Sequence, residues 1–209
     1  MKQKLELDSW NRKDHFLFFK QFDEPFYGVT VKIDCTAAYN FAKEKGVSFF
    51  LYTMHRALAA ANDLQPLKLR IENEEIFIYD RIDAGSTIAR SNDTFGFGYI
   101  TYADVFDEFI AMANQEVEKV QSSNELIRSN VNNIIRFSAL PWIDFTSISH
   151  ARMFSRPDSC PSISFGKMTQ KKNGKRSMPV SIHVHHALVD GLHVGQFIDL
   201  FQDLMNSPV

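Results

Sequence analysis

The sequence of 209 residues has little of what marks several large protein classes. It holds two cysteines, Cys35 and Cys160, far apart and outside metal-ligand spacing, so neither a disulfide framework nor a cysteine metal cluster is expected. It contains no apolar run of about 18 residues, and segment 1–8 lacks the apolar core of a secretory signal. These absences predict a cytoplasmic protein with reduced thiols.

Strong charge of one sign and glycine-rich loops are also missing. The formal net charge is −2, which argues against binding to nucleic acid or another polyanion. No Walker or dinucleotide glycine pattern is present, which disfavours nucleotide and NAD chemistry. The one basic cluster, 171–176, is interpreted as a solvated turn between strands. Because no repeat or linker interrupts the chain, one domain over residues 1–209 is predicted.

What the sequence has is apolar and aromatic residues in regular patterns. Hydrophobic residues make up 44% of the chain and include 19 phenylalanines, enough for a packed core. Period-2 alternation predicts strands at 29–34, 68–72, 75–80, 86–90, 94–102, 134–138, 143–149, 161–168 and 178–187. Helical periodicity and capping residues, with Thr36 and Ser48 as two of the caps, predict helices at 36–46, 48–63, 104–125 and 192–205. Strands that cluster without regular βαβ alternation indicate an α+β fold with a mixed or antiparallel sheet.

The most informative segment is 183–191, His-Val-His-His-Ala-Leu-Val-Asp-Gly. Alternation along the strand puts Ile182, Val184 and His186 on one face, which should be buried. A desolvated imidazole resists protonation, so His186 would be neutral near pH 7 and able to accept a proton. Asp190 follows at the turn into the last helix, close to that imidazole, where a helix cap and a functional carboxylate are equally good interpretations.

Four histidines, at 183, 185, 186 and 193, raise the question of a metal site. Adjacent His185 and His186 face opposite sides of a strand, and no further ligand follows at zinc spacing. No metal site is therefore predicted. His183 and His185 are interpreted as structural.

Segment 141–149, Pro-Trp-Ile-Asp-Phe-Thr-Ser-Ile-Ser, is the second informative stretch. On the predicted strand, Ile143, Phe145 and Ser147 share a face, which would place the Ser147 hydroxyl among apolar groups. A buried hydroxyl needs a hydrogen-bond partner, either backbone or a substrate oxygen. Ser147 lacks the Gly-x-Ser-x-Gly elbow of a nucleophile, so a donor role is favoured.

These residues resemble a known family. Residues 185–191 fit the HHxxxDG signature of CoA-dependent acyltransferases, and the longer run 184–195 is similar to the chloramphenicol acetyltransferases. Segments 10–16, 138–147 and 164–167 extend the resemblance, in the same order, over nearly the whole chain. The resemblance implies a CoA-dependent acyltransferase-like two-layer fold, in which helices flank a mixed sheet.

The resemblance also implies roles for single residues. His186 would be the general base that deprotonates an acceptor hydroxyl, which attacks the thioester of acetyl-CoA in a ternary complex. Ser147 would donate a hydrogen bond to the tetrahedral oxyanion. Asp190 would pair with Arg12 and hold the site together. Acetyl-CoA is expected as cosubstrate, with no metal or prosthetic group.

Further residues match the family's binding positions. Ser164 stands where threonine is usual, near the acceptor, and Lys167 matches a lysine near CoA, although a solvated lysine at the sheet edge fits as well. The aromatic acceptor pocket corresponds to Phe18, Phe19, Tyr27 and Phe145, which core packing would also explain. The family is homotrimeric, so each site is expected between two subunits, with His186 from one and much of the pocket from the other.

The sequence departs from the family mainly in the pocket. Asp23 stands at an apolar position, Val189 replaces a cysteine, Phe19 stands where some members have tyrosine, and Ser149-His150 replaces a stretch that contains asparagine. The catalytic residues thus match the family better than the acceptor pocket does. Acetyl transfer to chloramphenicol, and with it antibiotic resistance, is the leading hypothesis, and the departures in the pocket make transfer to another small alcohol or amine the alternative. A dihydrolipoamide acyltransferase core ranks lower because lipoyl modules and linkers are missing. A non-catalytic trimeric binding protein ranks lower because it would not need the catalytic residues together.

Overall fold

The main element of the fold is a seven-stranded mixed sheet. The structure is a computed structural model that describes residues 1–155 and 157–207. The strands run in the order β2-β10-β8-β7-β5-β6, and β9 pairs with β10. The pairs β5–β7 and β7–β8 are parallel and the others are antiparallel. The strands are β2 (Phe26–Asp34), β5 (Asp83–Ala89), β6 (Phe95–Ile100), β7 (Ile134–Leu140), β8 (Ser162–Gly166), β9 (Thr169–Gln170) and β10 (Arg176–His185).

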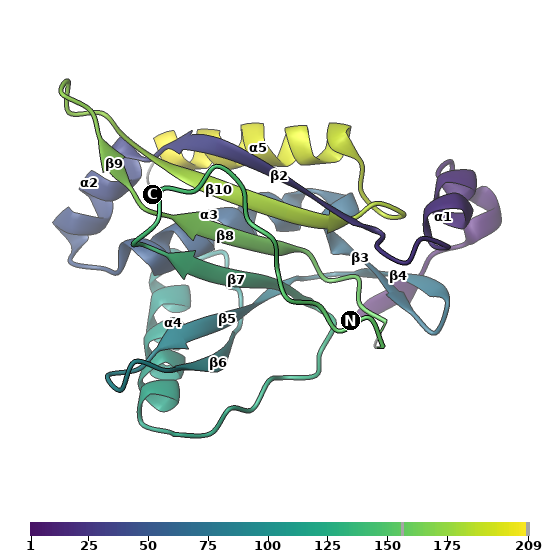
Figure 1. Cartoon of the computed structure of the whole chain (residues 1–209), viewed down its shortest axis with the longest axis horizontal. Coiled ribbons are helices and arrows are strands. Elements are labelled where there is room, and N and C mark those ends of the chain that lie inside the picture. Colours follow the sequence, from purple (N-terminus) through teal and green to yellow (C-terminus); the bar gives the residue numbers. More distant parts are fainter. Residues whose placement is uncertain (156, 208–209) are drawn as a thin grey trace.

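Helices cover one face of this sheet. Helices α2, α3 and α5 lie behind it in Figure 1, and the long connection 141–161 crosses in front. Helix α4 packs against β5 and β6, and α1 lies beside the end of β10. The predicted α+β fold with a mixed sheet and flanking helices is confirmed. The helices are α1 (Lys13–Phe19), α2 (Thr36–Lys45), α3 (Phe49–Asp63), α4 (Phe106–Gln121) and α5 (Gly191–Asn206), with 3₁₀ turns at Leu7–Ser9 and Gln65–Lys68.

Strand β10 lies within the sheet, between β2 and β8, and its two faces differ in chemistry. Val180, Ile182 and Val184 are buried in the hydrophobic core on the helix side. The residues between them, such as Ser181 and His183, face the connection 141–161. Polar side chains on that second face mean that it is not simply a second apolar core layer.

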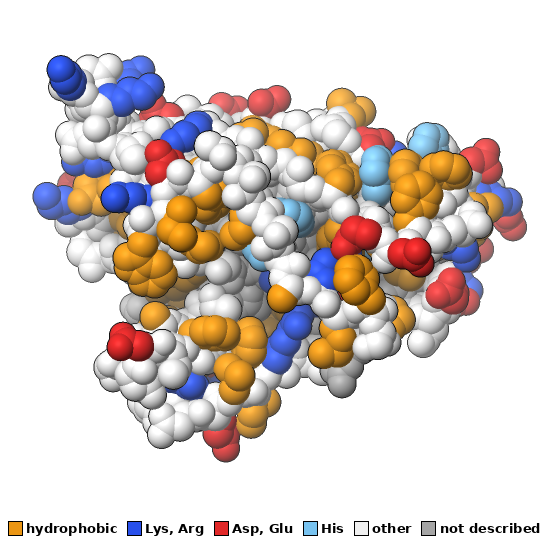
Figure 2. Space-filling model, in the orientation of Figure 1, with side chains coloured by type: hydrophobic (Ala, Val, Ile, Leu, Met, Phe, Trp, Pro, Cys, Tyr) orange, Lys and Arg blue, Asp and Glu red, His pale blue; other side chains and the backbone are white. Residues whose placement is uncertain are grey.

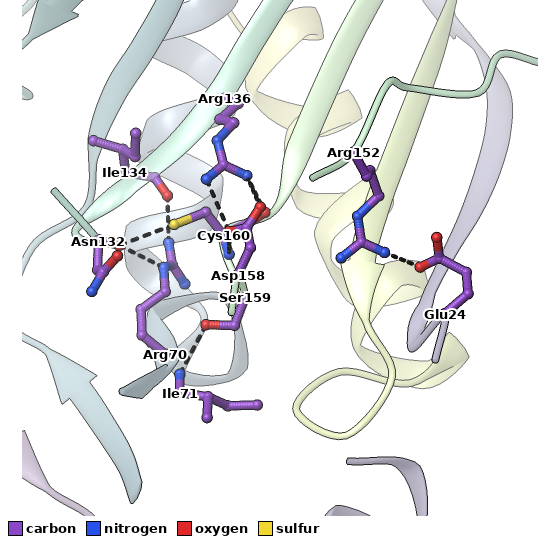
Figure 3. A network of polar contacts seen from close by, with 10 residues as sticks. All are labelled: Glu24, Arg70, Ile71, Asn132, Ile134, Arg136, Arg152, Asp158, Ser159 and Cys160. Carbon is purple, nitrogen blue, oxygen red and sulfur yellow. Dashed lines mark hydrogen bonds and ion pairs between the residues drawn. The ribbon is translucent and has the colours of Figure 1, made fainter. Parts of the chain in front are cut away.

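A small three-stranded sheet joins this core through a buried arginine. It has the order β1 (Lys2–Lys4), β4 (Glu75–Tyr79), β3 (Leu69–Glu72). The Arg70 side chain is fully buried and donates to the backbone carbonyls of Leu67, Leu69, Asn132 and Ile134 at 2.7–2.9 Å. Figure 3 shows the part of this network around Asn132 and Ile134. Arg70 thus ties the hairpin to the start of β7, because its donors would otherwise be buried without partners.

Segment 143–149 is not a strand, which corrects the prediction. Both edges of β8 are already paired, one with β7 and the other with β10, so the segment after β7 finds no free edge there. It crosses the sheet face instead, with Ile143 exposed and Phe145 buried. Thr36 begins α2 but does not cap it, since the N-cap residue is Cys35. Helix α1 and strand β1 were not predicted.

Both cysteines are buried free thiols. Burial raises the pKa of the Cys35 thiol to about 12, and burial also raises the pKa of Cys160. No described helix is long and apolar enough to cross a membrane. Within the described residues, no three or more His, Cys, Asp or Glu side chains gather in a way that could hold a metal ion.

Candidate active site

His186 lies just beyond the end of β10, in a tight turn. The carbonyl of His185 accepts hydrogen bonds from the amides of Leu188 and Val189, both at 3.0 Å, which closes the turn. The His186 amide donates to the Pro25 carbonyl at 2.8 Å. The backbone of His186 is therefore attached to the segment that leads into β2.

The imidazole of His186 packs among aromatic rings. It stacks on Phe19 with ring centroids 3.8 Å apart and planes 7° apart. Tyr27 covers it at 4.6 Å and 44°. Nδ1 is buried and makes no hydrogen bond within the described part of the chain. Since Nδ1 is covered, Nε2 is the ring nitrogen left for a contact with substrate.

Arg12 and Asp190 form a second set of contacts to the backbone of His186. Arg12 forms an ion pair with Asp190, and its second terminal nitrogen donates to the His186 carbonyl at 3.5 Å. The predicted pairing of these two residues is confirmed. Asp190 also caps α5 by accepting from the amide of Leu192 at 3.1 Å, so this carboxylate makes both the helix cap and the ion pair. Arg12 thus links the Asp190 carboxylate to the backbone carbonyl of His186.

Electrostatics keep Asp190 ionised. Burial alone would raise its pKa, but His193 and Arg12 outweigh burial and hold the pKa of the carboxyl below its usual value. The side chain of Arg12 is only 14% exposed, so solvent screens the pair weakly. The pair is therefore a stable support for the turn at neutral pH.

His183 and His185 have structural contacts. Nδ1 of His185 accepts from the amide of Ala187 at 3.3 Å, which supports the turn before His186. Burial, followed by the charge of Arg152, lowers the pKa of His185 to about 4. The ring of His183 lies directly over Gly28, where an added Cβ would meet Nε2 at 2.3 Å. Glycine at this position of β2 therefore lets the imidazole cross the neighbouring strand.

Ser147 lies on the connection 141–161 and is exposed, not surrounded by apolar groups as predicted. The connection is attached to the sheet on both sides of it. Phe145 packs against Gly166 in β8. On the other side, Nε2 of His150 lies 3.4 Å from the buried Ser164 hydroxyl. Ser147 is thus presented to solvent between two fixed points.

The predicted site residues form two groups within one chain. The first surrounds the end of β10 and contains His186, Arg12, Asp190, Phe18, Phe19 and Tyr27. The second follows the connection and β8 and contains Phe145, Ser147, Ser164 and Lys167.

The strand register shows that Lys167 in the second group lies far from His186 in the first. Phe165 pairs with Val180, so Lys167, just beyond the end of β8, lies near the start of β10. At about 3.3 Å a residue, it is roughly 25 Å from His186. Lys167 is also exposed. One chain therefore does not gather all the predicted residues around His186.

Sequence reasoning missed one ion pair at the site, between Glu24 and Arg152. The two residues are 128 positions apart and pair beside Pro25. No local pattern links them, because Glu24 lies in a loop and Arg152 lies in the irregular connection. Their opposite charges were the only signal, and many surface residues share it.

A family model, a relative and a solved structure all relate this chain to the same group of proteins. A family model described as chloramphenicol acetyltransferase matches residues 2–202. Chloramphenicol acetyltransferase 3 of Escherichia coli is 28% identical over 209 residues, covering 99% of this chain and 98% of that protein. A solved chloramphenicol acetyltransferase superposes with a TM-score of 0.90 at 29% identity, covering 97% of this chain and 99% of the other.

A more distant neighbour shows how widely the fold is shared. The truncated catalytic core of the 2-oxoacid dehydrogenase multienzyme complex from Thermoplasma acidophilum superposes with a TM-score of 0.70 at 16% identity, covering 99% of both chains. At this identity the likeness concerns the fold alone.

Proposed function

The chain belongs to the chloramphenicol acetyltransferase family, a family of acyltransferases, and we propose that it transfers an acetyl group from acetyl-CoA to a hydroxyl of chloramphenicol. His186 Nε2 takes the proton of the acceptor hydroxyl while its oxygen attacks the thioester carbonyl. The tetrahedral intermediate then collapses, the C–S bond breaks, and the thiolate of CoA recovers the proton from the imidazolium.

The observation that carries this proposal is the way His186 is fixed. Its ring is held against Phe19, its amide is bonded to Pro25, and its carbonyl receives Arg12. A general base works only within hydrogen-bond reach of the proton it abstracts, so an imidazole that is fixed in place suits this role.

Ser147 supplies the second part of the chemistry in this proposal. Its hydroxyl would donate to the oxyanion as the thioester carbonyl becomes tetrahedral. The hydroxyl is exposed on the connection, which suits contact with a substrate from outside the chain. Ser164, Phe18 and Tyr27 would contact the acceptor, and Lys167 would contact CoA.

We further propose a homotrimer in which each site is shared between two subunits. The separation of His186 from Lys167 supports this arrangement, because a neighbouring chain would bring the second group to the first. Apolar side chains exposed on the connection also support it. Figure 2, which looks onto this face, shows such side chains around a hollow, and the connection contributes Trp142, Ile143, Met153 and Phe154. Light scattering should give three times the chain mass, and a monomer would contradict the arrangement.

One charged residue near the proposed site bears on the identity of the acceptor. Asp23 is exposed in the loop before β2, and a carboxylate there would favour a polar or cationic alcohol or amine. A cytoplasmic location and a role in antibiotic resistance complete the proposal. Growth on chloramphenicol with and without the gene would test the role in resistance.

Release of CoA thiol from acetyl-CoA tests the function directly. Wild-type protein should release thiol with chloramphenicol, and His186→Ala should lose about 10²–10⁴-fold in kcat with an unchanged circular dichroism spectrum. If chloramphenicol gives no thiol release but another acceptor does, the assigned acceptor would change and the proposed acetyl transfer would stand. No release with any of a panel of alcohols and amines would favour a binding protein.

A further inference from the structure

We propose that Arg152 is a positioning residue for His186 and acts through Glu24 and Pro25. This inference rests on the proposed role of His186 as general base. It assigns a function to an ion pair between the loop before β2 and the connection 141–161.

The geometry forms a continuous chain of contacts. Arg152 pairs with Oε1 of Glu24, as Figure 3 shows. The same oxygen accepts from the amide of Phe26 at 2.9 Å, which bends the backbone around Pro25. The carbonyl of Pro25 then points at the amide of His186 and accepts from it at 2.8 Å. Fixing Glu24 therefore fixes the acceptor of the hydrogen bond that holds His186.

Arg152 is well placed to anchor this series of contacts. Its guanidinium lies 3.8 Å from the centroid of the Phe26 ring, within the range of a cation–π contact. Its side chain is 21% exposed, against 48% for Glu24. A planar cation held by both a ring and a carboxylate loses less freedom on pairing than a free surface side chain. The pair therefore orders the loop more than a fully solvated ion pair would.

A second contact leads from Arg152 to the same turn. Phe26 meets His185 edge to face at 5.3 Å and 71°. The positive charge of Arg152 also disfavours a proton on His185. A neutral His185 can accept from the amide of Ala187 and so keeps the turn in shape. Arg152 thus reaches the turn that carries His186 through Phe26 and His185 as well as through Glu24 and Pro25.

The experiment compares Arg152→Gln, Glu24→Gln and the double variant with wild type in the full-length protein. The control is Lys4→Gln, which removes an exposed ion pair with Glu75 on the small sheet. Two quantities are measured: hydrogen exchange at the His186 amide by mass spectrometry of overlapping peptides, and kcat and KM by thiol release from acetyl-CoA. Thermal melting checks that each variant is folded.

Each single variant should speed exchange at the His186 amide about tenfold and lower kcat about tenfold, because small displacements of a base are costly. KM for acetyl-CoA should stay within about twofold, and the double variant should be no worse than either single one. Arg152→Lys keeps the positive charge beside Glu24 and Phe26 and should retain part of the protection at the His186 amide. Lys4→Gln should change none of these values.

Unchanged exchange at His186 in both single variants would overturn the proposal, as would additive losses in the double variant. Because exchange needs no turnover, it tests the positioning even if no acceptor releases thiol. In that case the proposed function would fail while the structural link from Arg152 to His186 could still be seen. Faster exchange with an unchanged kcat would show that the link does not position a base, and would also overturn the inference.

Discussion

The two faces of β10 place different demands on adjacent residues of one strand. Ile182 lies in the hydrophobic core on the helix side of the sheet and is 1% exposed. His183, its neighbour, faces the connection 141–161 and contacts His150 edge to face at 4.7 Å. On the first face, the shape and the apolar area of a side chain determine which residue fits. On the second, hydrogen bonds and ring contacts hold an irregular segment that carries Ser147. We expect substitutions on the first face to reduce stability and those on the second to reduce activity.

The largest effect is expected on the helix side. Ile182→Ala leaves a cavity in a packed core and should lower the free energy of unfolding by about 2–5 kcal/mol. Urea denaturation followed by circular dichroism measures this change. The kcat of the folded protein should stay near that of wild type. A large loss of kcat without loss of stability would contradict the expected difference between the two faces of β10.

The next effect concerns the connection. Ser147→Ala removes the proposed oxyanion donor and should lower kcat about 10²–10³-fold, as loss of such donors does elsewhere. Stability should not change, because the side chain is exposed. The assay is thiol release at saturating chloramphenicol and acetyl-CoA. Ser149→Ala is the matched control, and equal losses in both variants would argue against a specific role for Ser147.

A pH titration of stability compares a buried histidine from each side of the sheet. His55 in α3 and His185 in β10 both have pKa values lowered to about 4, chiefly by burial. The unfolded chain binds these protons near pH 6.5, so stability is fully present above that pH and falls as pH drops toward 4. Each histidine should contribute roughly 2–3 kcal/mol to this loss. Urea midpoints at pH 7.5 and 5 should differ less in His185→Gln than in wild type, and an unchanged difference would contradict this.

The smallest effect is expected at Ser164, which is buried beside His150. Ser164→Ala removes one hydroxyl and should raise KM for chloramphenicol about fivefold, or about 1 kcal/mol. Ser164→Thr restores the hydroxyl and should recover most of the affinity. If KM rises equally in both variants, packing and not the hydroxyl determines binding there.

The sequence predicted well the features that depend on local patterns. Strand β10 and helix α5 follow from alternation and helical periodicity in adjacent segments. The pairing of Arg12 with Asp190, which are 178 positions apart, came only from the resemblance. The strand at 143–149 was wrong because alternation cannot tell whether a neighbouring strand has a free edge. The Glu24–Arg152 pair could not be predicted because irregular loops bring it together.

The two buried thiols have a practical consequence for measuring catalysis. Thiol release is followed with an aromatic disulfide that reacts with thiolates, and any reactive cysteine of the protein would add to the signal. Cys35 and Cys160 are both shielded from solvent, and their raised pKa values keep them as thiols. The native protein therefore contributes almost no background, so slow variants can be assayed at high enzyme concentration. A burst of colour before acetyl-CoA is added would instead report unfolded chains.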